Sequence, residues 1–258
     1  MFDCGLHPAY KGIYALPFFD VLDPAEIDLI LISHCHIDHW GSLPYFTTKT
    51  DFKGKVVMTL PTKAIFSYIV QDYIRLSDCS SSEILFDELD WHESMKNIIP
   101  IRIHEELYLE GVKIKAYNAG HVLGAAMFLV EIEGVKIFYT GDYSREPDRH
   151  LKPAEIPDTE IDILIVESTY GTSIHEPRYK REDRFKATVL DTVCNKQGKW
   201  LLPVYALGRA QEILMLLNEF FQEHECLKNI PIHISGSLAR KSLNILKTYK
   251  SVMGEYLK

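Results

Sequence analysis

The sequence predicts an α/β protein with two parts: a sandwich of strands and helices over residues 1–170, and part of a second α/β unit over residues 171–258. Two observations predict this class. Short apolar runs that suit buried strands alternate with stretches in which apolar residues recur at helical spacing. The 258 residues are also 47% hydrophobic, which is enough for one large core or two modest ones.

The apolar runs are each bounded by turn-forming residues and are predicted to be strands. The dipeptide Glu133-Gly134 between two of these runs favours a hairpin turn. In chain order, the predicted strands are Leu29–Ser33, Lys55–Thr59, Ile98–His104, Val112–Tyr117, Ala125–Ile132, Val135–Thr140, Asp162–Glu167, Lys199–Val204 and Ile230–Ser235.

Longer amphipathic stretches are predicted to be helices. They are Thr62–Leu76, Arg184–Asn195, Gly208–His224 and Ser237–Tyr249. In the third helix, the residues expected to be buried are Leu214, Leu217 and Phe221, and those expected to face water are Glu212, Glu219 and Glu223. Because strands dominate the first part and alternate with helices in the second, the chain reads as two α/β units.

A dense group of metal-competent side chains follows the first predicted strand. The segment Ser33–His39 reads H-x-H-x-D-H and contains His34, His36, Asp38 and His39. Imidazole nitrogens and carboxylate oxygens are ligands of zinc and neighbouring divalent metals. The two histidines nearest the strand can face one side of an extended turn, and the other pair the adjacent side. The spacing therefore predicts two metals about 3.5–4 Å apart, against the alternative of a polar loop with coincidental histidines.

Two later positions supply further ligands. His121 lies between Gly120 and Gly124, on a loop between two predicted strands where the backbone can approach a metal closely. Asp142 follows Gly141 at the end of another strand, where its two oxygens can bridge two cations. Each residue alone would be read as a loop or turn former, but together with the first motif each is predicted to be a ligand.

The order of these motifs resembles the metallo-β-lactamase superfamily. The matching segments are Phe2–Gly5, His34–His39, Gly120-His121 and Tyr139–Asp142. The segment Glu167–Gly171 resembles the start of the β-CASP branch, whose members cut nucleic acids. Three longer stretches resemble the endonucleases that cut pre-mRNA at the poly(A) site: AGHVLGAAMF at 119–128, YTGDYSREPDRHL at 139–151 and ALGRAQE at 206–212.

The resemblance implies an αββα sandwich followed by part of a β-CASP domain, and a zinc-dependent RNA endonuclease with two Zn²⁺ ions. One ion would be held by His34, His36 and His121, and the other by Asp38, His39 and Asp142, with Asp142 shared. Hydroxide would attack the scissile phosphorus, leaving a 3′-hydroxyl and a 5′-phosphate. The implied partners are RNA and other subunits of a cleavage and polyadenylation complex, and the implied location is the nucleus.

Glu167 and Asp38 are the carboxylates expected to take part in catalysis. In the family, two late histidines complete the site, and one of them is the general acid. These would lie beyond Lys258, and Glu167 would orient that acid. The family's strand pair before Asp3 would likewise lie outside the chain, so we read the chain as a fragment that is inactive alone. Asp3 either orders the H-x-H-x-D-H loop or only forms a turn.

Composition limits the other possibilities. A net charge of −8 argues against charge-driven binding of nucleic acid and favours partner proteins that deliver the RNA. The five cysteines lack C-x-x-C spacing and read as reduced thiols in an intracellular protein, with Cys35 pointing away from the metals. No signal peptide or membrane-spanning run is evident.

Four alternatives remain open on the sequence alone. An Integrator-type RNA endonuclease and a DNA-cutting β-CASP nuclease share most of the motifs. A small-molecule hydrolase of the lactamase kind shares H-x-H-x-D-H but does not account for Glu167–Gly171. A non-catalytic scaffold relative should have lost ligands, whereas all the expected ones are present.

Overall fold

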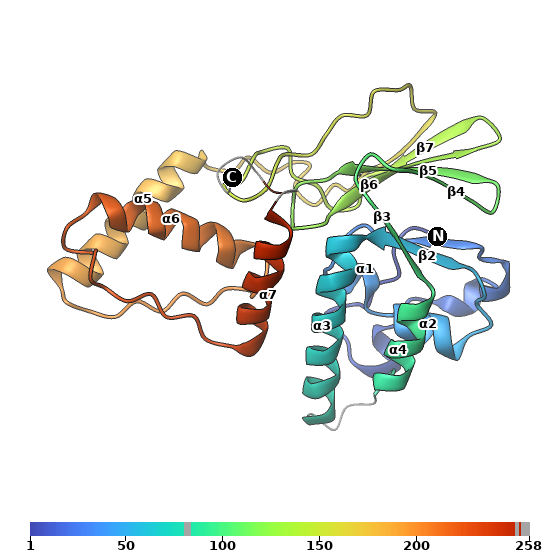
Figure 1. Cartoon of the computed structure of the whole chain (residues 1–258), viewed down its shortest axis with the longest axis horizontal. Helices are drawn as coiled ribbons and strands as arrows, with labels where there is room; N and C mark the ends of the chain where they lie inside the picture. The colour runs from blue at the N-terminus through green and yellow to red at the C-terminus, as the bar shows by residue number, and fades with distance from the viewer. Residues whose placement is uncertain (80–83, 251–252, 254–258) are drawn as a thin grey trace.

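A computed structural model describes residues 1–79, 84–250 and 253, with only the backbone described over 76–79. Strands and helices mix over the first two thirds of the chain, and helices predominate in the last third (Figure 1). The first two thirds form two stacked sheets with a layer of helices on one side. The mixed α/β class predicted from the sequence is confirmed.

The first sheet is parallel and has the order β1 (Leu29–Leu31), β2 (Lys55–Thr59), β3 (Ile98–Ile101). Short apolar runs form it because β1 and β2 are buried on both faces, as is usual for parallel strands. The helices beside it are α1 (Ile37–Trp40), α2 (Leu43–Lys49), α3 (Leu60–Cys79) and α4 (Glu88–Lys96). Trp40, Phe46 and Phe66 are fully buried between these helices and the sheet.

The second sheet has the order β4 (Glu106–Leu109), β5 (Val112–Asn118), β6 (Ala126–Ile132), β7 (Val135–Tyr139), β8 (Ile163–Ile165). Its strands are antiparallel except for the last pair. A buried apolar layer lies between the two sheets and includes Leu31, Val57, Ile101, Ile114 and Phe128. This layer holds the carboxyl end of β1 against β6, where the metal-competent residues gather.

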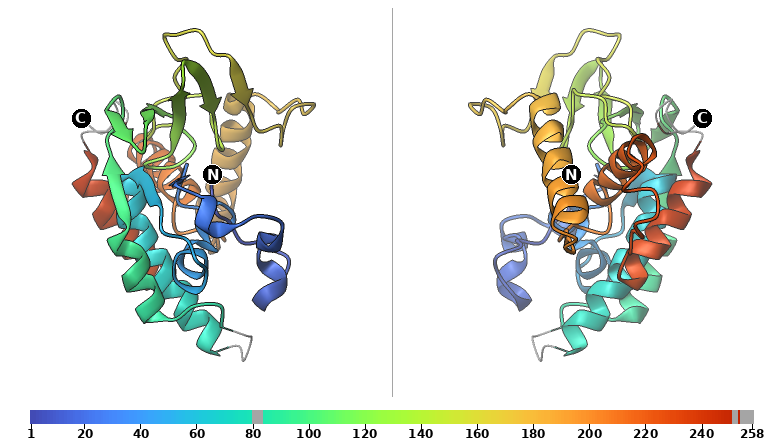
Figure 2. Two further views of the ribbon diagram at one scale, coloured as in Figure 1. Left: turned by 90° about the vertical axis from the view of Figure 1, so that its right-hand side faces the viewer. Right: turned by 90° about the vertical axis from the view of Figure 1, so that its left-hand side faces the viewer.

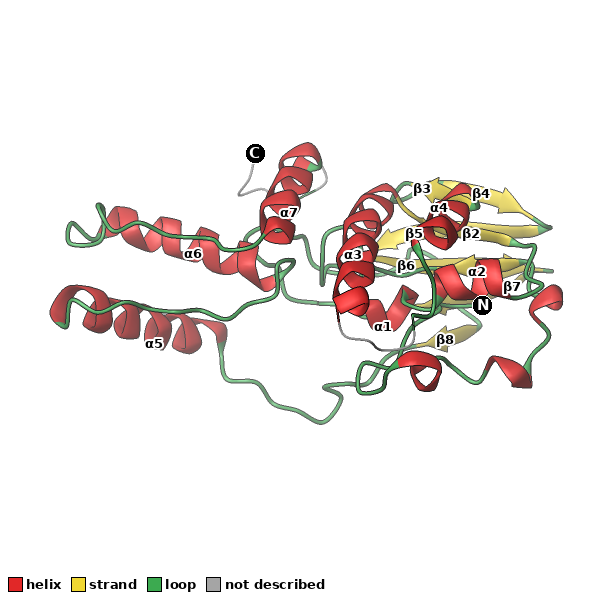
Figure 3. Ribbon diagram, turned by 90° about the horizontal axis from the view of Figure 1, so that it is seen from below, coloured by secondary structure: helices red, strands yellow, loops and turns green. Residues whose placement is uncertain are grey.

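The helical part of the chain lies beside the sheets in Figure 3. Its elements are α5 (Arg178–Leu190), a π-helical turn (Asp191–Asn195), α6 (Arg209–Glu223) and α7 (Ser237–Thr248). Helix α7 packs against α3, and α5 packs on α6 through Val189, Leu217 and Phe220. None of the described helices is both long and apolar enough to cross a membrane.

Two predicted strands are wrong. The runs Lys199–Val204 and Ile230–Ser235 have no regular secondary structure and pair with no strand among the described residues. Side chains such as Leu201 are exposed there. An apolar run indicates a strand only if a neighbouring edge takes its N–H and C=O groups, and periodicity does not report that edge. Over residues 171–258, the described secondary structure is therefore helical.

The chain between the N-terminus and β1 forms three short 3₁₀ turns at Gly12–Ala15, Phe19–Val21 and Pro24–Glu26. This segment projects from the body of the molecule in the side views of Figure 2. No secondary structure was predicted for these turns, nor for α1, α2, α4 and β4. Helix α4 had a local signal, because Asp87 and Asp90 cap each other at its start.

The reduced state predicted for all five cysteines is wrong for one pair. Cys194 and Cys226 form a disulfide that closes the loop between α5 and the segment after α6, with their Cα atoms 6.2 Å apart. Their separation along the sequence gave no indication of this contact. Cys4 and Cys35 are free and buried, and burial raises the pKa of each thiol to about 12. Cys35 packs in an apolar cluster with Ile65 and Val122, away from the histidines, as predicted.

Candidate metal centre

The loop after β1 carries four of the six predicted ligands. It leaves the sheet at Ile32, extends through Cys35 and enters α1 directly after His36. The carbonyl of Ser33 accepts a hydrogen bond from the Ala126 amide on β6 at 2.9 Å, and the Trp40 indole donates to the Cys35 carbonyl at 2.7 Å. The loop is therefore held at both ends, one side by the second sheet and the other by the first helix.

Three histidines meet on one side of this loop. His34 Nε2 lies 2.9 Å from His36 Nδ1, and His121 Nε2 lies 3.2 Å from the same nitrogen. His121 reaches this point because Gly120 and His121 both adopt positive φ, which turns the loop between β5 and β6 inward. At position 120, the Cβ of any other residue would lie 2.8 Å from the Ser144 carbonyl oxygen, so the turn requires glycine.

Asp142 stands between the three histidines and a second pair of residues. One of its oxygens, Oδ2, lies 4.0 Å from His34 Nε2 and 3.7 Å from His121 Nε2. The other, Oδ1, lies 3.5 Å from His39 Nε2. Gly141 allows this placement, because a Cβ there would meet the Ser33 side chain at 2.5 Å. The two oxygens of Asp142 therefore face different histidines.

Asp38 and His39 form the other side of the cluster, on the first turn of α1. The Asp38 carboxylate lies 3.7 Å from His39 Nε2, and half of its side chain is exposed. One donor atom from each of four residues lies within 4.8 Å of the others: His34, His36, His121 and Asp142. Asp38 and His39 lie outside that tight group, and His39 approaches it at Asp142.

Burial sets the protonation states of the histidine group. It lowers the pKa of His34, His36 and His121, and repulsion from neighbouring imidazoles adds to the effect, although Asp38 opposes it at His36. The pKa of His121 falls to about 4. Burial and the negative charge of Glu167 raise the pKa of Asp142, although His39 opposes them. Neutral imidazoles with converging nitrogens are the form that a metal ion requires of its ligands.

Of the two readings left open for Asp3, its hydrogen bonds favour the one in which it orders the loop. Its Oδ1 accepts the Ser33 amide at 2.7 Å, and its Oδ2 accepts the Ser33 hydroxyl at 2.8 Å and the Tyr139 hydroxyl at 2.5 Å. The same oxygen pairs with His39 Nδ1 at 2.6 Å. Burial opposes a charge on His39, but Asp3 and the other carboxylates outweigh it, so the pKa of His39 is raised.

Replacing Asp3 with asparagine is expected to weaken metal binding about 10- to 100-fold, the usual cost of losing a partner that orients a ligand. Asparagine tolerates the positive φ of 57° at this position, so the backbone should be retained while the acceptor for His39 is lost. Zinc competition against a chromophoric chelator measures the change. Asp51→Asn, an exposed site on the loop before β2, is the control. Unchanged affinity in Asp3→Asn would remove Asp3 from the site.

Glu167 follows β8 and is half-buried. Its Oε2 accepts the Thr169 amide at 2.7 Å, which closes a turn, and its own amide donates to the Thr140 hydroxyl at 3.4 Å. It lies near enough to Asp142 and His121 to influence the pKa of both. The structure thus places Glu167 beside the cluster, outside the group of converging donor atoms.

A second polar cluster was missed by sequence analysis. Glu212, which was predicted to face water, is buried between two arginines: it lies 3.0 Å from Arg149 and also pairs with Arg178. It also pairs with His150 at 3.1 Å. Glu212 was assigned to the water-facing side of the helix because periodicity does not show that its charge pairs with residues distant in the sequence. Arg209, at the start of α6, lies 3.9 Å from Asp148.

Comparison with known proteins relates the chain to a family and to several curated relatives. Residues 1–168 match the family described as the metallo-beta-lactamase superfamily domain. The chain is 48% identical over 99% of its length to cleavage and polyadenylation specificity factor subunit 3 of Dictyostelium discoideum, and 50% identical over its whole length to subunit 3-I of Arabidopsis thaliana. It is 47% identical over its whole length to endoribonuclease ysh1 of Schizosaccharomyces pombe. The chain covers 33%, 37% and 34% of these three relatives, so it spans about a third of their length.

Proposed function

The chain belongs to the metallo-beta-lactamase superfamily, and on that premise we propose that its protein is a metal-dependent RNA endonuclease that cuts pre-mRNA at the poly(A) site. The observation that carries the proposal is the placement of Asp142, whose two oxygens face the histidine trio and His39 separately. The names of the relatives supply the reaction: one is an endoribonuclease and others are subunits of a cleavage and polyadenylation factor.

The donor set fits two zinc ions. Imidazole nitrogens and carboxylate oxygens are borderline ligands that zinc accepts well. His34, His36 and His121 would hold one ion and Asp38 with His39 the other, with Asp142 shared between them. When bound, such ions supply Lewis acidity that makes hydroxide available near neutral pH and offsets negative charge on the scissile phosphate.

Hydrogen bonds from neighbouring residues orient the rings of two of these ligands. Asp3 fixes the ring of His39 through Nδ1 and leaves Nε2 facing Asp142. Ser33 does the same for His34, with its hydroxyl 3.0 Å from Nδ1. In the proposed hydrolysis, water adds to phosphorus and the bond to O3′ breaks, giving a 3′-hydroxyl and a 5′-phosphate. The departing O3′ needs a proton, and Glu167 is proposed to orient its donor.

Delivery of the RNA is proposed to depend on other subunits of a cleavage and polyadenylation complex. The chain's net charge of −8 gives it little attraction for a polyanion. Since pre-mRNA is processed in the nucleus, the protein is proposed to act there. We also propose that residues 1–170 form the metallo-β-lactamase domain and residues 171–258 form part of a β-CASP domain.

The full-length protein is expected to bind close to two zinc ions per chain and to cleave single-stranded RNA only when metal is present. Elemental analysis of the purified protein gives the metal content. Cleavage of a labelled RNA is then compared with that of the same sequence as DNA, before and after chelation and zinc readdition. Digestion of the downstream product by a 5′-phosphate-dependent exonuclease checks the products. Protein without metal, or cleavage that survives chelation, would contradict the proposal.

A further inference from the structure

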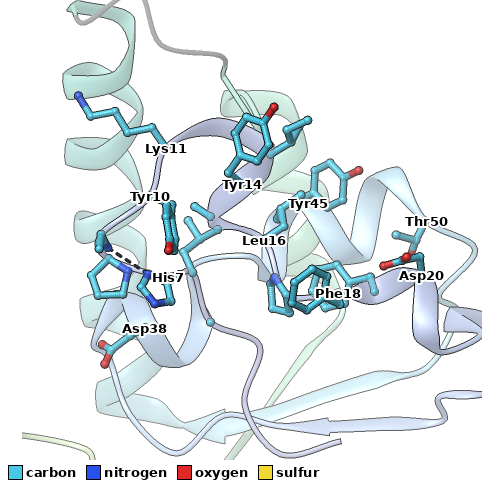
Figure 4. A pocket seen from close by; sticks show the side chains of 18 of the residues that line it. His7, Tyr10, Lys11, Tyr14, Leu16, Phe18, Asp20, Asp38, Tyr45 and Thr50 are labelled. Carbon is cyan, nitrogen blue, oxygen red and sulfur yellow. Dashed lines mark hydrogen bonds between the residues drawn. The ribbon is translucent and has the colours of Figure 1, made fainter.

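The segment between Asp3 and β1 encloses a hollow beside the metal centre (Figure 4). Its volume is about 1260 Å³, and residues of the N-terminal segment form most of its wall. The side chains that the argument uses are His7, Tyr10, Lys11, Tyr14, Phe18 and Asp38. Asp38 lies at one end of this hollow in Figure 4 and also lies 3.7 Å from His39 in the candidate site. Asp38 therefore lies both on the wall of the hollow and in the candidate metal centre.

Aromatic side chains stand exposed around the hollow. Tyr10 is 59% exposed, Tyr14 78% and Phe18 83%. Ile13 and Val21 on the same segment are exposed as well. A contiguous group of large apolar side chains on a protein surface usually marks a binding site. Aromatic rings offer flat faces, and flat π-systems are what they stack against most favourably.

The segment is fastened to the helix that carries Asp38 and His39. The amide of Leu6 donates to the Ile37 carbonyl at 3.1 Å, and the Cys4 amide donates to the His39 carbonyl at 2.7 Å. Gly5 lies so close that a Cβ there would overlap the Asp38 carbonyl, at 1.7 Å. Further along the segment, Phe19 packs against Phe46 with ring centroids 4.7 Å apart. The exposed rings therefore project from a base that is fixed relative to the candidate ligands.

The charges around the hollow do not favour a purely electrostatic ligand. Lys11 is a cation on its wall, and Asp20 and Asp38 are anions. A ligand that enters must gain its affinity from stacking and from burial of flat apolar surface. Unpaired nucleic-acid bases have such faces, and stacking on aromatic side chains accepts any base.

We propose that this hollow binds unpaired bases of the RNA substrate next to the scissile phosphate, with Tyr14 and Phe18 as stacking partners. The inference rests on the proposed function. An RNA that extends from the metal centre past Asp38 would meet the ring of Tyr10 first and those of Tyr14 and Phe18 farther along the hollow, as their places in Figure 4 indicate. A companion protein seated in the same hollow would compete with RNA for the space beside Asp38, and for that reason we favour the base.

The test uses the full-length protein and a short single-stranded RNA with 2-aminopurine at successive positions around the cleavage site. Stacking on an aromatic ring quenches the fluorescence of 2-aminopurine. Wild-type protein is expected to quench it at one or two adjacent positions. Tyr14→Ala and Phe18→Ala should abolish the quenching and raise the KM for cleavage about tenfold, with a smaller change in kcat. Tyr14→Phe, which keeps the ring, should behave as wild type.

Tyr108→Ala is the matched control, because Tyr108 is a comparably exposed ring on β4, away from the hollow. Quenching and KM that stay at wild-type values in both alanine variants would overturn the proposal. So would variants that cleave free RNA normally and fail only with companion subunits, since that result assigns the hollow to a protein. The quenching assay needs no cleavage, so an inactive protein that still quenches through Tyr14 would contradict the proposed function and support the base-binding site.

Discussion

Replacing His36 or Asp142 with alanine is expected to abolish RNA cleavage by the full-length protein. His36 Nδ1 is the atom on which the nitrogens of His34 and His121 converge, at 2.9 and 3.2 Å. Asp142 is the carboxylate that faces both halves of the cluster. Loss of either should lower the rate by more than the roughly 100-fold that follows loss of an orienting partner. Initial rates on labelled RNA measure the effect.

Matched substitutions separate loss of a ligand from loss of fold. His92→Ala removes an exposed histidine from α4 and Asp183→Ala an exposed aspartate from α5. Both should cleave at wild-type rates. The metal content of each variant, measured in parallel, should fall in His36→Ala and Asp142→Ala and stay constant in the controls. Wild-type cleavage by either ligand variant would refute the site assignment.

Replacing Arg149 with leucine is expected to cost about 3 kcal/mol in the free energy of unfolding, at the lower end of what breaking a buried ion pair costs. The Arg149 guanidinium is 13% exposed and pairs with Glu182 at 2.7 Å, Glu219 at 2.8 Å and Glu212 at 3.0 Å. Leucine would leave the 9% exposed Glu212 with fewer partners. Urea unfolding followed by circular dichroism measures the change.

Arg184→Leu is the control for Arg149, because Arg184 also lies on α5 but pairs with Glu176 at the surface, with 68% of its side chain exposed. Such a surface pair contributes about 0–1 kcal/mol. An equal decrease in the free energy of unfolding in the two variants would mean that the Arg149 cluster contributes no more than a surface ion pair.

The same contacts give the Arg149 effect a pH dependence. Hydrogen bonds from Arg149 and Arg178 outweigh the effect of burial and lower the pKa of Glu182 from 4.5 to about 2. Because the folded state holds this pKa below its unfolded value, the stabilisation is present above pH 4.5 and is lost as the pH falls towards 2. Stability should therefore fall through this window in the wild type, and less steeply in Arg149→Leu.

The metal centre was the part of the molecule that the sequence described best. Four candidate ligands lie within one short segment, so their proximity follows from local geometry. His121 and Asp142 are distant in the chain, but each follows a strand beside a glycine. Strand ends of one sandwich gather at the same edge, and both residues lie close to the loop after β1.

Long-range pairing was harder to predict. The apolar runs at Lys199–Val204 and Ile230–Ser235 have strand composition, yet among the described residues neither pairs with another strand. The burial of Glu212 depends on Arg149, which is distant in the sequence. The disulfide between Cys194 and Cys226 depends on how two segments of the helical part meet. In each case the local sequence was compatible with the structure, but the deciding partner lay elsewhere in the chain.

The cluster around Arg149 ties the helical part of the chain to one edge of the metal centre. Arg149 lies on the loop that starts at Asp142, and its side chain joins α5 through Glu182 and α6 through Glu212 and Glu219. Movement of these helices away from the sheets would either displace that loop or break the ion pairs of Arg149. The edge at Asp142 should therefore stay fixed relative to these helices, and any separation of the helical part from the sheets should be largest on the side away from Arg149.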